Sequence, residues 1–598
     1  MKESAADIIK RLNGLLLDQS QRISMLERHF FMYGHSTINN PQPIMSIDGG
    51  KVRLNIVQSC VQTLLNKVTK NQPRVTFLTD NGDWGKQETA KKREKFVYGQ
   101  FHKSGVYQKV PQACLQALAY GDGYVKIYAD GKEVAVDPVL TPSVIIDEAE
   151  CLYGPPRTYF EIRYMDKETL KEIYEKHADK IEKLQTIAIP FYMSGTIKRN
   201  FIQVVEYWKM GVTEESHGDH RIILGNDLEV LKEEWNKKRP PFRKIGFVGN
   251  LVGAYSKGVA ECVTPFQLEA NRTLMRISDA LRLVASPKVL YEYQSKIVSS
   301  HFNNDVGSMI GYAGTPPAFI MPQAVSPELF QHLAWCVQSA YQEVGISQLS
   351  ANSEKPAGLN SGKALREYQD IETERFAAFE RAHEQLYIEI ADDSLEVAKE
   401  IVEKHGAYAV LSPDPKGCEQ INFKEIGSKS DDYIIQRYPT SQLPKDPAGR
   451  LEYVAELTAA QMLTPEESMM LLDFPDTEKI TSLKTSELDD IMHTVDYMLS
   501  KDKYLPPEPF QNLEMGIQLM KKAYLKYKNR GCPDKKLDLL IKWINDALIL
   551  TTPPADPAIT ADELVAPDAN SPAMIEEEMM PPQEELITED MGALPPPV

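Results

Sequence analysis

The segment Gly358-Leu359-Asn360-Ser361-Gly362-Lys363-Ala364 is the part of this 598-residue chain closest in composition to a nucleotide-binding motif. A phosphate-binding loop holds phosphates with glycine backbone amides and a lysine, and the serine or threonine that follows binds magnesium. Here the two glycines are one residue too close together, and Ala364 stands at the magnesium-binding position. The segment also follows a stretch of small residues instead of a strand. We therefore favour a flexible loop that leads into a helix over an ATP site.

Two further groups of side chains have the chemistry of a metal site. Asp147, Glu148 and Glu150 follow a predicted strand and could hold the cation of a metal-dependent nuclease, although a solvated strand end is the favoured interpretation. His217 and His220 lie on a predicted turn without third and fourth ligands nearby, which favours a solvated hairpin tip. Since the chain also lacks the common hydrolase motifs, we predict no catalytic residue, no bound metal and no cofactor.

The densest group of basic residues is Lys237-Lys238-Arg239-Pro240-Pro241-Phe242-Arg243-Lys244. Such a patch could contact nucleic acid or an acidic partner, but a surface connector or an intersubunit contact is favoured in an acidic chain.

The charge of the whole chain is strongly negative. The formal net charge is -18, and residues 552–598 supply 11 acidic and no basic side chains, so the rest carries about -7. A protein that grips DNA by neutralising phosphates needs a basic face, and this balance argues against one. A surface that DNA slides past is still compatible with it.

Composition also limits the class of protein. The length predicts several domains, and the hydrophobic content of 42% is sufficient for globular cores. We expect neither a membrane span nor a signal peptide, because no apolar run approaches about 18 residues and the N-terminus lacks an apolar core. The seven scattered cysteines indicate free thiols in a reducing compartment.

Residues 264–405 contain the helices that would position the loop at 358–364. The first helix is predicted at Pro265–Ser286, with Thr264 as its N-cap and Gln267 completing a capping box. A second runs from 326 to 345, where Gly345 ends it. The third, at 362–404, contains no proline and no internal glycine, and would be roughly 65 Å long.

The other segments alternate between helical and strand periodicity, which predicts an α+β protein that is predominantly helical. Further helices are predicted at about 5–31, 56–69, 86–103, 110–119 and 167–183, and through most of 447–549. Strands are predicted at 74–78, 124–128, 133–136, 144–146, 159–163, 201–208, 220–224, 409–411 and 433–436. The acidic, proline-rich residues 552–598 are typical of a disordered tail.

The order helix, insert, helix, small-residue loop and long helix resembles the portal proteins of tailed bacteriophages. Local sequence also resembles that family at Asn71–Val75, Ala119–Tyr124, Pro265–Asn271 and Leu359–Leu365. The resemblance covers most of residues 1–500, and the order and spacing of these segments carry more weight than any one of them.

The resemblance implies a portal-type fold with wing, stem, clip and helical crown, assembling as a ring. Its implied parts are the wing at 1–255, stem helix 1 at 256–286, the clip at 287–325, stem helix 2 at 326–345, the tunnel loop at 346–361, the long wing helix at 362–404, the wing return strands at 405–446, the helical crown at 447–551 and the acidic Pro-rich disordered tail at 552–598. Two predicted strands of the clip, at 288–291 and 318–321, are suited to pairing between neighbouring subunits.

The resemblance also implies two sets of functional residues. The tunnel-loop side chains nearest to DNA would be Ser350, Asn352, Ser353, Glu354, Lys355 and Asn360. The clip residues that dock the terminase or an adaptor would be Lys288, Tyr291, Tyr293, Phe302, Tyr312 and Phe319. Lys355 is the only cation of the first set and the best candidate for a phosphate contact.

The implied function is structural and not enzymatic. A homo-oligomeric ring of twelve copies would occupy one capsid vertex, and double-stranded DNA would be packaged and ejected through its channel. Implied partners are the terminase large subunit, head-completion and tail adaptor proteins, and the major capsid and scaffolding proteins, with no membrane. The protein would be assembled in the host cytoplasm and located in the virion. The alternatives are a nucleic-acid-processing enzyme (an ATPase or a metal-dependent nuclease) and a self-associating structural adaptor.

Overall fold

The computed structural model confirms a mixed α+β protein that is predominantly helical. It divides into two compact units, one formed by 1–484 with 526–533 and the other by 485–525 with 534–598. The residues that it describes are 3–34, 54–70, 72–79, 84–152, 154–186, 200–212, 216–237, 239–285, 288–290, 318–320, 326–347, 375–414, 417–426, 433–438, 447–460, 462, 468 and 475–551.

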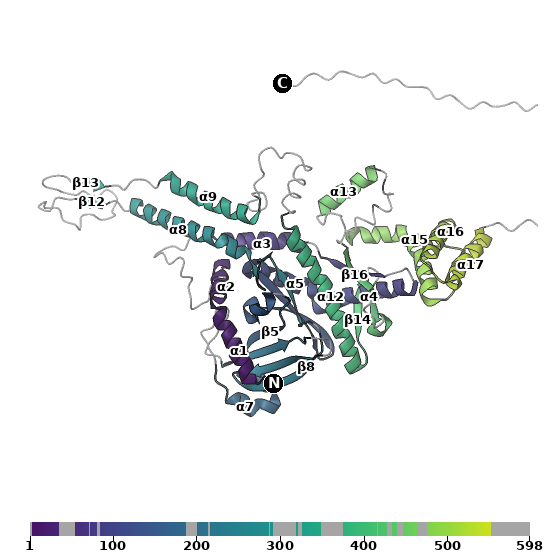
Figure 1. Cartoon of the computed structure of the whole chain (residues 1–598). Coiled ribbons are helices and arrows are strands. Elements are labelled where there is room, and N and C mark those ends of the chain that lie inside the picture. Colours follow the sequence, from purple (N-terminus) through teal and green to yellow (C-terminus); the bar gives the residue numbers. More distant parts are fainter. Residues whose placement is uncertain are drawn as a thin grey trace, which may run out of the picture. The chain divides into compact units, whose positions relative to one another are not determined.

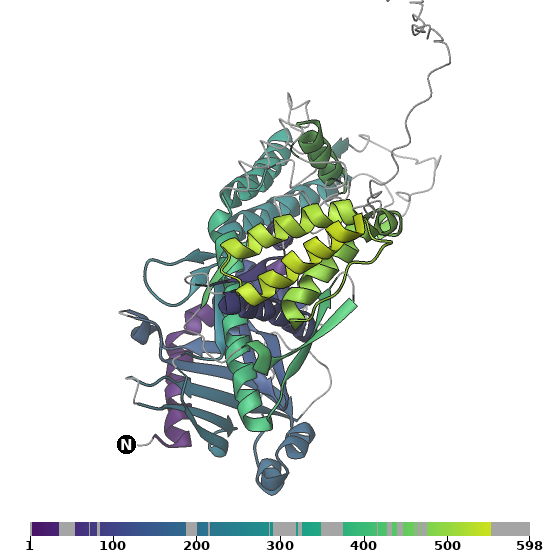
Figure 2. The same ribbon diagram turned by 90° about the vertical axis from the view of Figure 1, so that its right-hand side faces the viewer.

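An antiparallel five-stranded sheet forms one part of the first unit. Its strands, in spatial order, are β4 (Val144–Ile146), β5 (Thr158–Asp166), β6 (Phe201–Lys209), β7 (Gly218–Leu224) and β8 (Leu228–Trp235). The helix α1 (Ala5–Asp18) lies against this sheet, as Figures 1 and 2 show. Its Ile8 and Leu12 are completely buried against aromatic residues of β5 and β6.

The single helix predicted at 5–31 is two helices, α1 and α2 (Ser20–Tyr33). Gln19 separates the two helices, and its side chain forms hydrogen bonds with other segments of the chain. Its amide donates to the Ile146 carbonyl over 2.8 Å and accepts from the Tyr255 hydroxyl over 3.0 Å. The prediction at 167–183 was also too simple, since the segment forms α6 (Lys167–Ile173), a 3-10 turn and α7 (Ala178–Glu182).

A second sheet has three strands in the order β3 (Glu133–Val139), β2 (Asp122–Asp130) and β9 (Phe242–Gly246). The predicted β2–β3 hairpin is confirmed, and Gly131 in its turn has the positive φ of 58° that glycine tolerates best. Strand β9 was not predicted. It begins inside the basic segment at 237–244, for which a surface connector or an intersubunit contact was favoured.

The main core lies between this sheet and a set of helices. These are α3 (Ile56–Thr69), α4 (Trp84–Ser104), α5 (Val106–Tyr120) and α12 (Ala377–His405). The helix α12 starts after a turn at 375–376, so it is shorter than the predicted helix at 362–404. No glycine or proline marks this turn in the sequence. Phe376 buries its ring in the main core, which holds the turn in place.

The strands predicted at 409–411 and 433–436 are both present. Strand β16 (Tyr433–Tyr438) pairs antiparallel with β1 (Arg74–Thr79), more than 350 residues earlier in the chain. Between them, β14 (Ala409–Asp414) pairs with β15 (Gly417–Asn422) and packs beside α4. A short hairpin of β10 (Val248–Gly249) and β11 (Ser256–Lys257) precedes the next long helix.

The two predicted stem helices are present as α8 (Val259–Ala285) and α9 (Pro327–Val344). The prediction for α9 is confirmed: the Ser326 side chain caps it and Gly345 ends it at a φ of 84°. The predicted start of α8 was wrong, since Pro265 lies inside the helix. The preceding turn stays helical because Val259, Ala260 and Val263 are buried in the main core, which outweighs the cost of an internal proline, about 3 kcal/mol.

The predicted helical region after 447 is also confirmed for the described residues. It contains α13 (Pro447–Ala459) in the first unit, α15 (Pro475–Lys501), α16 (Leu513–Asn529) and α17 (Asp534–Thr551). In the second unit, α16 and α17 pack side by side (Figure 2), and the ring of Trp543 packs against Gly516. The division between the units falls inside α15.

Candidate assembly hairpin

The helices α8 and α9 form an antiparallel hairpin. Figure 1 shows them side by side, with β12 (Lys288–Leu290) and β13 (Ala318–Ile320) beyond their ends. The two strands pair with each other inside one chain, with Val289 opposite Phe319. Their predicted use in pairing between subunits stays a prediction, since the ladder uses only one edge of each strand.

The base of the hairpin is tied firmly to the body by Gln267 on α8. Its side-chain oxygen accepts from the backbone amides of Ile56, over 2.8 Å, and Val57, over 3.3 Å. Its amide nitrogen donates to the Leu54 carbonyl over 2.6 Å and to Asn271 over 2.9 Å. Gln267 thus caps the N-terminus of α3, a neighbouring helix, instead of its own helix as predicted.

The hairpin presents large apolar side chains to solvent. Phe330 and Trp335 on α9 are 48% and 54% exposed, and Leu281 on α8 is also about half exposed. His332 stacks on Trp335 with ring centroids 5.7 Å apart, and its Nε2 lies 3.5 Å from Glu269 on α8. Exposed aromatic and aliphatic side chains gathered on two helices are typical of a protein interface. The hairpin therefore carries an exposed apolar surface.

The predicted functional residues of the tunnel loop all lie outside the described residues, as does the 358–364 segment. Of the predicted clip residues, Lys288 and Phe319 are placed on β12 and β13, one register position apart. Tyr291, Tyr293, Phe302 and Tyr312 lie outside the described residues.

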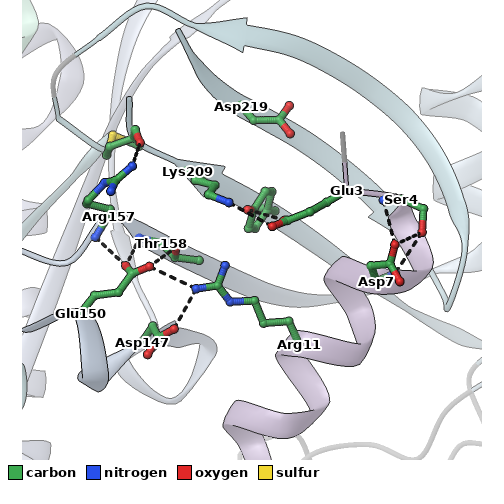
Figure 3. A network of polar contacts seen from close by, with 12 residues as sticks. Glu3, Ser4, Asp7, Arg11, Asp147, Glu150, Arg157, Thr158, Lys209 and Asp219 are labelled. Carbon is green, nitrogen blue, oxygen red and sulfur yellow. Dashed lines mark hydrogen bonds and ion pairs between the residues drawn. The ribbon is translucent and has the colours of Figure 1, made fainter. Parts of the chain in front are cut away.

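The acidic segment after β4 forms a structural clasp (Figure 3). Arg11 on α1 donates to Asp147 over 2.8 Å and to Glu150 over 3.1 Å. Glu150 also accepts from the backbone amides of Arg157 and Thr158 and from the Thr158 hydroxyl, over 2.8 to 2.9 Å. These contacts join α1 to the start of β5. The predicted solvated strand end is thus wrong for Asp147 and Glu150.

The predicted hairpin tip at His220 is also wrong, since this residue lies on β7 with its side chain largely buried. Its ring stacks on Trp208 at a centroid distance of 5.0 Å and its Nδ1 contacts Glu233 over 2.5 Å. Within the described parts of the chain, no group of three or more histidine, cysteine or acidic side chains is arranged to hold a metal ion.

The described residues of the basic segment at 237–244, predicted to be a surface connector or an intersubunit contact, pack against an acidic face of α12 of the same chain. Lys237 lies 2.7 Å from Glu400, and Arg239 lies 4.0 Å from Asp392. Arg243 forms a buried ion pair with Asp393. Burial raises the pKa of Asp393 above its usual value, although the adjacent guanidinium acts in the opposite direction. This segment therefore holds the three-stranded sheet on α12.

Three largely buried charges, Lys126, Glu161 and Glu206, lie between the two sheets with the exposed Arg163 beside them, and this group was not predicted from the sequence. The Nζ atom of Lys126 on β2 lies 2.9 Å from Glu161 and also contacts Glu206, while Arg163 contacts Glu161 over 2.5 Å. Lys126 is only 7% exposed. Its position inside the otherwise apolar β2 pattern was the one available signal, because a lysine on a buried strand requires a charged partner.

Among the helices of the described residues, none combines the length and the apolar character needed to cross a membrane. Comparison of the chain with models of known protein families finds no match, and comparison with curated proteins also finds none.

Proposed function

We propose that this chain is the portal protein of a tailed bacteriophage. The observation that carries the proposal is the hairpin of α8 and α9, which is anchored in an α+β body, extended by a small β-hairpin and exposes large apolar side chains. The chain then returns through α12 and β16 to the same body. This is the order of parts implied by the resemblance of the sequence to portal proteins.

In this proposal, the mechanism is geometric. Copies of the chain pack side by side through the outer faces of α8 and α9, and these helices surround a channel for double-stranded DNA. The acidic body does not retain the phosphates that pass it. The clip docks the terminase large subunit during packaging and adaptor proteins afterwards, and the ring joins capsid and scaffolding proteins at one vertex.

Negative-stain electron microscopy of the purified chain tests the proposal. We expect closed rings with a central hole wide enough for duplex DNA. The double variant Phe330→Ser/Trp335→Ser should assemble at least about tenfold more weakly, because both apolar contacts between copies are lost. Gln331→Ser, at an exposed polar position on the same helix, is the matched control and should assemble like the wild type.

A chain that stays monomeric across salt conditions contradicts the proposal. Rings that form without a continuous axial hole indicate the structural adaptor instead. The enzyme alternative requires ATP hydrolysis or magnesium-dependent DNA cleavage by the purified protein, and the clasp of Arg11 with Asp147 and Glu150 gives it no support at those carboxylates.

A further inference from the structure

The tip of the β10–β11 hairpin is an apolar knob. Leu251 is fully exposed and Val252 is 67% exposed, while Val248 at the base is about half exposed. The turn has a defined shape, because the Asn250 side chain donates to the Tyr255 carbonyl over 3.0 Å and Gly253 has a φ of 103°. A turn of fixed shape that holds two aliphatic side chains in solvent is suited to insertion into a pocket.

A pocket of suitable character lies on the same unit, between α4, β1 and the β14–β15 pair. Its volume of about 570 Å³ falls within the range of protein binding pockets. The guanidinium of Arg74 lies 5.0 Å from the ring centroid of Tyr98 at its edge. We call this pocket the socket, and its apolar lining consists of Val75, Val97, Phe101, Tyr107 and Pro413.

The knob and the socket of one chain lie at opposite ends of α5. Tyr107, which lines the socket, is in the first turn of this helix. The base of the knob is fixed beyond its last turn, where the Phe247 amide donates to the Gly121 carbonyl over 2.9 Å. The intervening helix is about 21 Å long, at 1.5 Å per residue. The knob therefore cannot enter the socket of its own chain.

Charges beside the two features are complementary. The knob has Lys257 opposite Val248 in its ladder and the carboxylate of Glu148 beside Gly253. The socket is lined by the charged residues Arg74, Lys91, Glu94, Lys95 and Glu419. Lys91 pairs with Glu88 and Lys95 with Glu419, which leaves Glu94 and Arg74. Within the described residues, none of the side chains of Lys257, Glu148, Glu94 and Arg74 forms an ion pair or a side-chain hydrogen bond. Burial raises the pKa of Glu94, with Arg74 acting in the opposite direction, so a cation supplied by another chain would relieve an unfavourable position.

We propose that the knob of one copy enters the socket of the next copy, with Lys257 facing Glu94 and Glu148 facing Arg74. The contact is head-to-tail, because each copy offers a knob on one side and a socket on the other. Such a contact repeats around a ring when the rotation between copies closes. The inference deepens the proposed function and rests on it, since it names a contact between ring neighbours.

Mass photometry of purified variants tests the contact. Leu251→Ser/Val252→Ser should weaken assembly at least about tenfold, because the knob loses its apolar surface. Val212→Ser is the matched control: this valine is 73% exposed in another turn and should have no effect. Lys257→Glu and Glu94→Lys should each weaken assembly, and the double variant Lys257→Glu/Glu94→Lys should restore it. Thermal unfolding of each variant confirms that it is folded.

A mixing experiment tests the head-to-tail geometry. A variant without the knob, Leu251→Ser/Val252→Ser, is mixed with one whose socket edge carries the wrong charge, Glu94→Lys. Only one intact contact can form between the two variants, so the mixture should yield dimers and no rings. Rings that form equally well with every variant overturn the knob-and-socket contact and leave the proposed function standing, whereas a monomeric wild type overturns the proposed function itself.

Discussion

Lys126 shows how a single side chain can hold two sheets together. Glu161 and Glu206 face each other directly across β5 and β6, where two negative charges repel. Lys126 reaches them from β2, in the other sheet. Burial opposes the ionisation of Glu161, but Lys126 and the adjacent Arg163 outweigh it and lower the pKa of this carboxyl.

Lys126→Met should lower the free energy of unfolding by about 3–5 kcal/mol, because it leaves two buried carboxylates with less positive charge. Lys132→Met, at the exposed turn between β2 and β3, should change it by less than about 0.5 kcal/mol. Denaturant unfolding measures both. Equal stability of the two variants would contradict the structural role of Lys126.

The same group predicts a dependence on pH. A carboxyl with a lowered pKa in the folded state contributes stability above its unfolded value of 4.5, and this contribution is lost as the pH falls through the folded pKa. The difference in stability between wild type and Lys126→Met should therefore be largest near neutral pH and should decrease below about pH 4.5. A constant difference down to pH 3 would exclude this explanation.

Gln267 on α8 stabilises the N-terminus of a different helix, α3. Gln267→Leu should destabilise the protein by about 1–3 kcal/mol, because the amides of Ile56 and Val57 lose their buried acceptor. Gln338→Leu, on the exposed face of α9, is the control. Hydrogen exchange should quicken in the first turn of α3 in the first variant only. Faster exchange confined to α8 would argue against the capping role.

At the scale of elements, a buried ion pair joins β9 to α12. Arg243→Met should destabilise the protein by several kcal/mol near neutral pH, because Asp393 is left buried without its partner. The penalty should vanish below about pH 3.8, where aspartate is protonated in the unfolded chain as well. Arg239→Met should cost less than about 1 kcal/mol, since Arg239 is exposed and 4.0 Å from Asp392.

Adding Asp393→Asn to Arg243→Met should recover most of the lost stability, because the uncompensated buried charge is removed. Thermal unfolding of the single and double variants measures this recovery. A double variant as unstable as the single one would show that Arg243 acts through packing and not through charge.

Which elements the sequence predicts depends on whether local signals and tertiary burial agree. For α9 they agree, since Ser326 caps it, proline occupies its first position and Gly345 ends it. For α8 they conflict: the cap-and-proline pattern at 264–265 lies within a helix because the preceding residues are buried in the main core. Strand β8 was missed because charged residues interrupt its alternation, and it sits at a sheet edge.

At the scale of the whole molecule, the order of parts was easier to predict than the contacts between them. Helix periodicity and caps predicted α8 and α9, and strand periodicity predicted β14 and β16. The helices of the candidate assembly hairpin could therefore be predicted. The socket and the charged contacts of α12 could not, because each joins residues far apart in the chain, and the knob could not, because its strands are only two residues long. Nothing in the sequence around Leu251 and Val252 indicates that these aliphatic side chains are exposed at a turn.

The pairing of β1 with β16 has a consequence for synthesis on the ribosome. The two strands are separated by about 350 residues, so β1 waits roughly 20 to 70 s for its partner at about 5–20 residues per second. During that time the hairpin of α8 and α9 has already emerged with its apolar side chains uncovered. If copies associate through this hairpin, as we propose, nascent chains on one messenger would be able to do so before their bodies are complete.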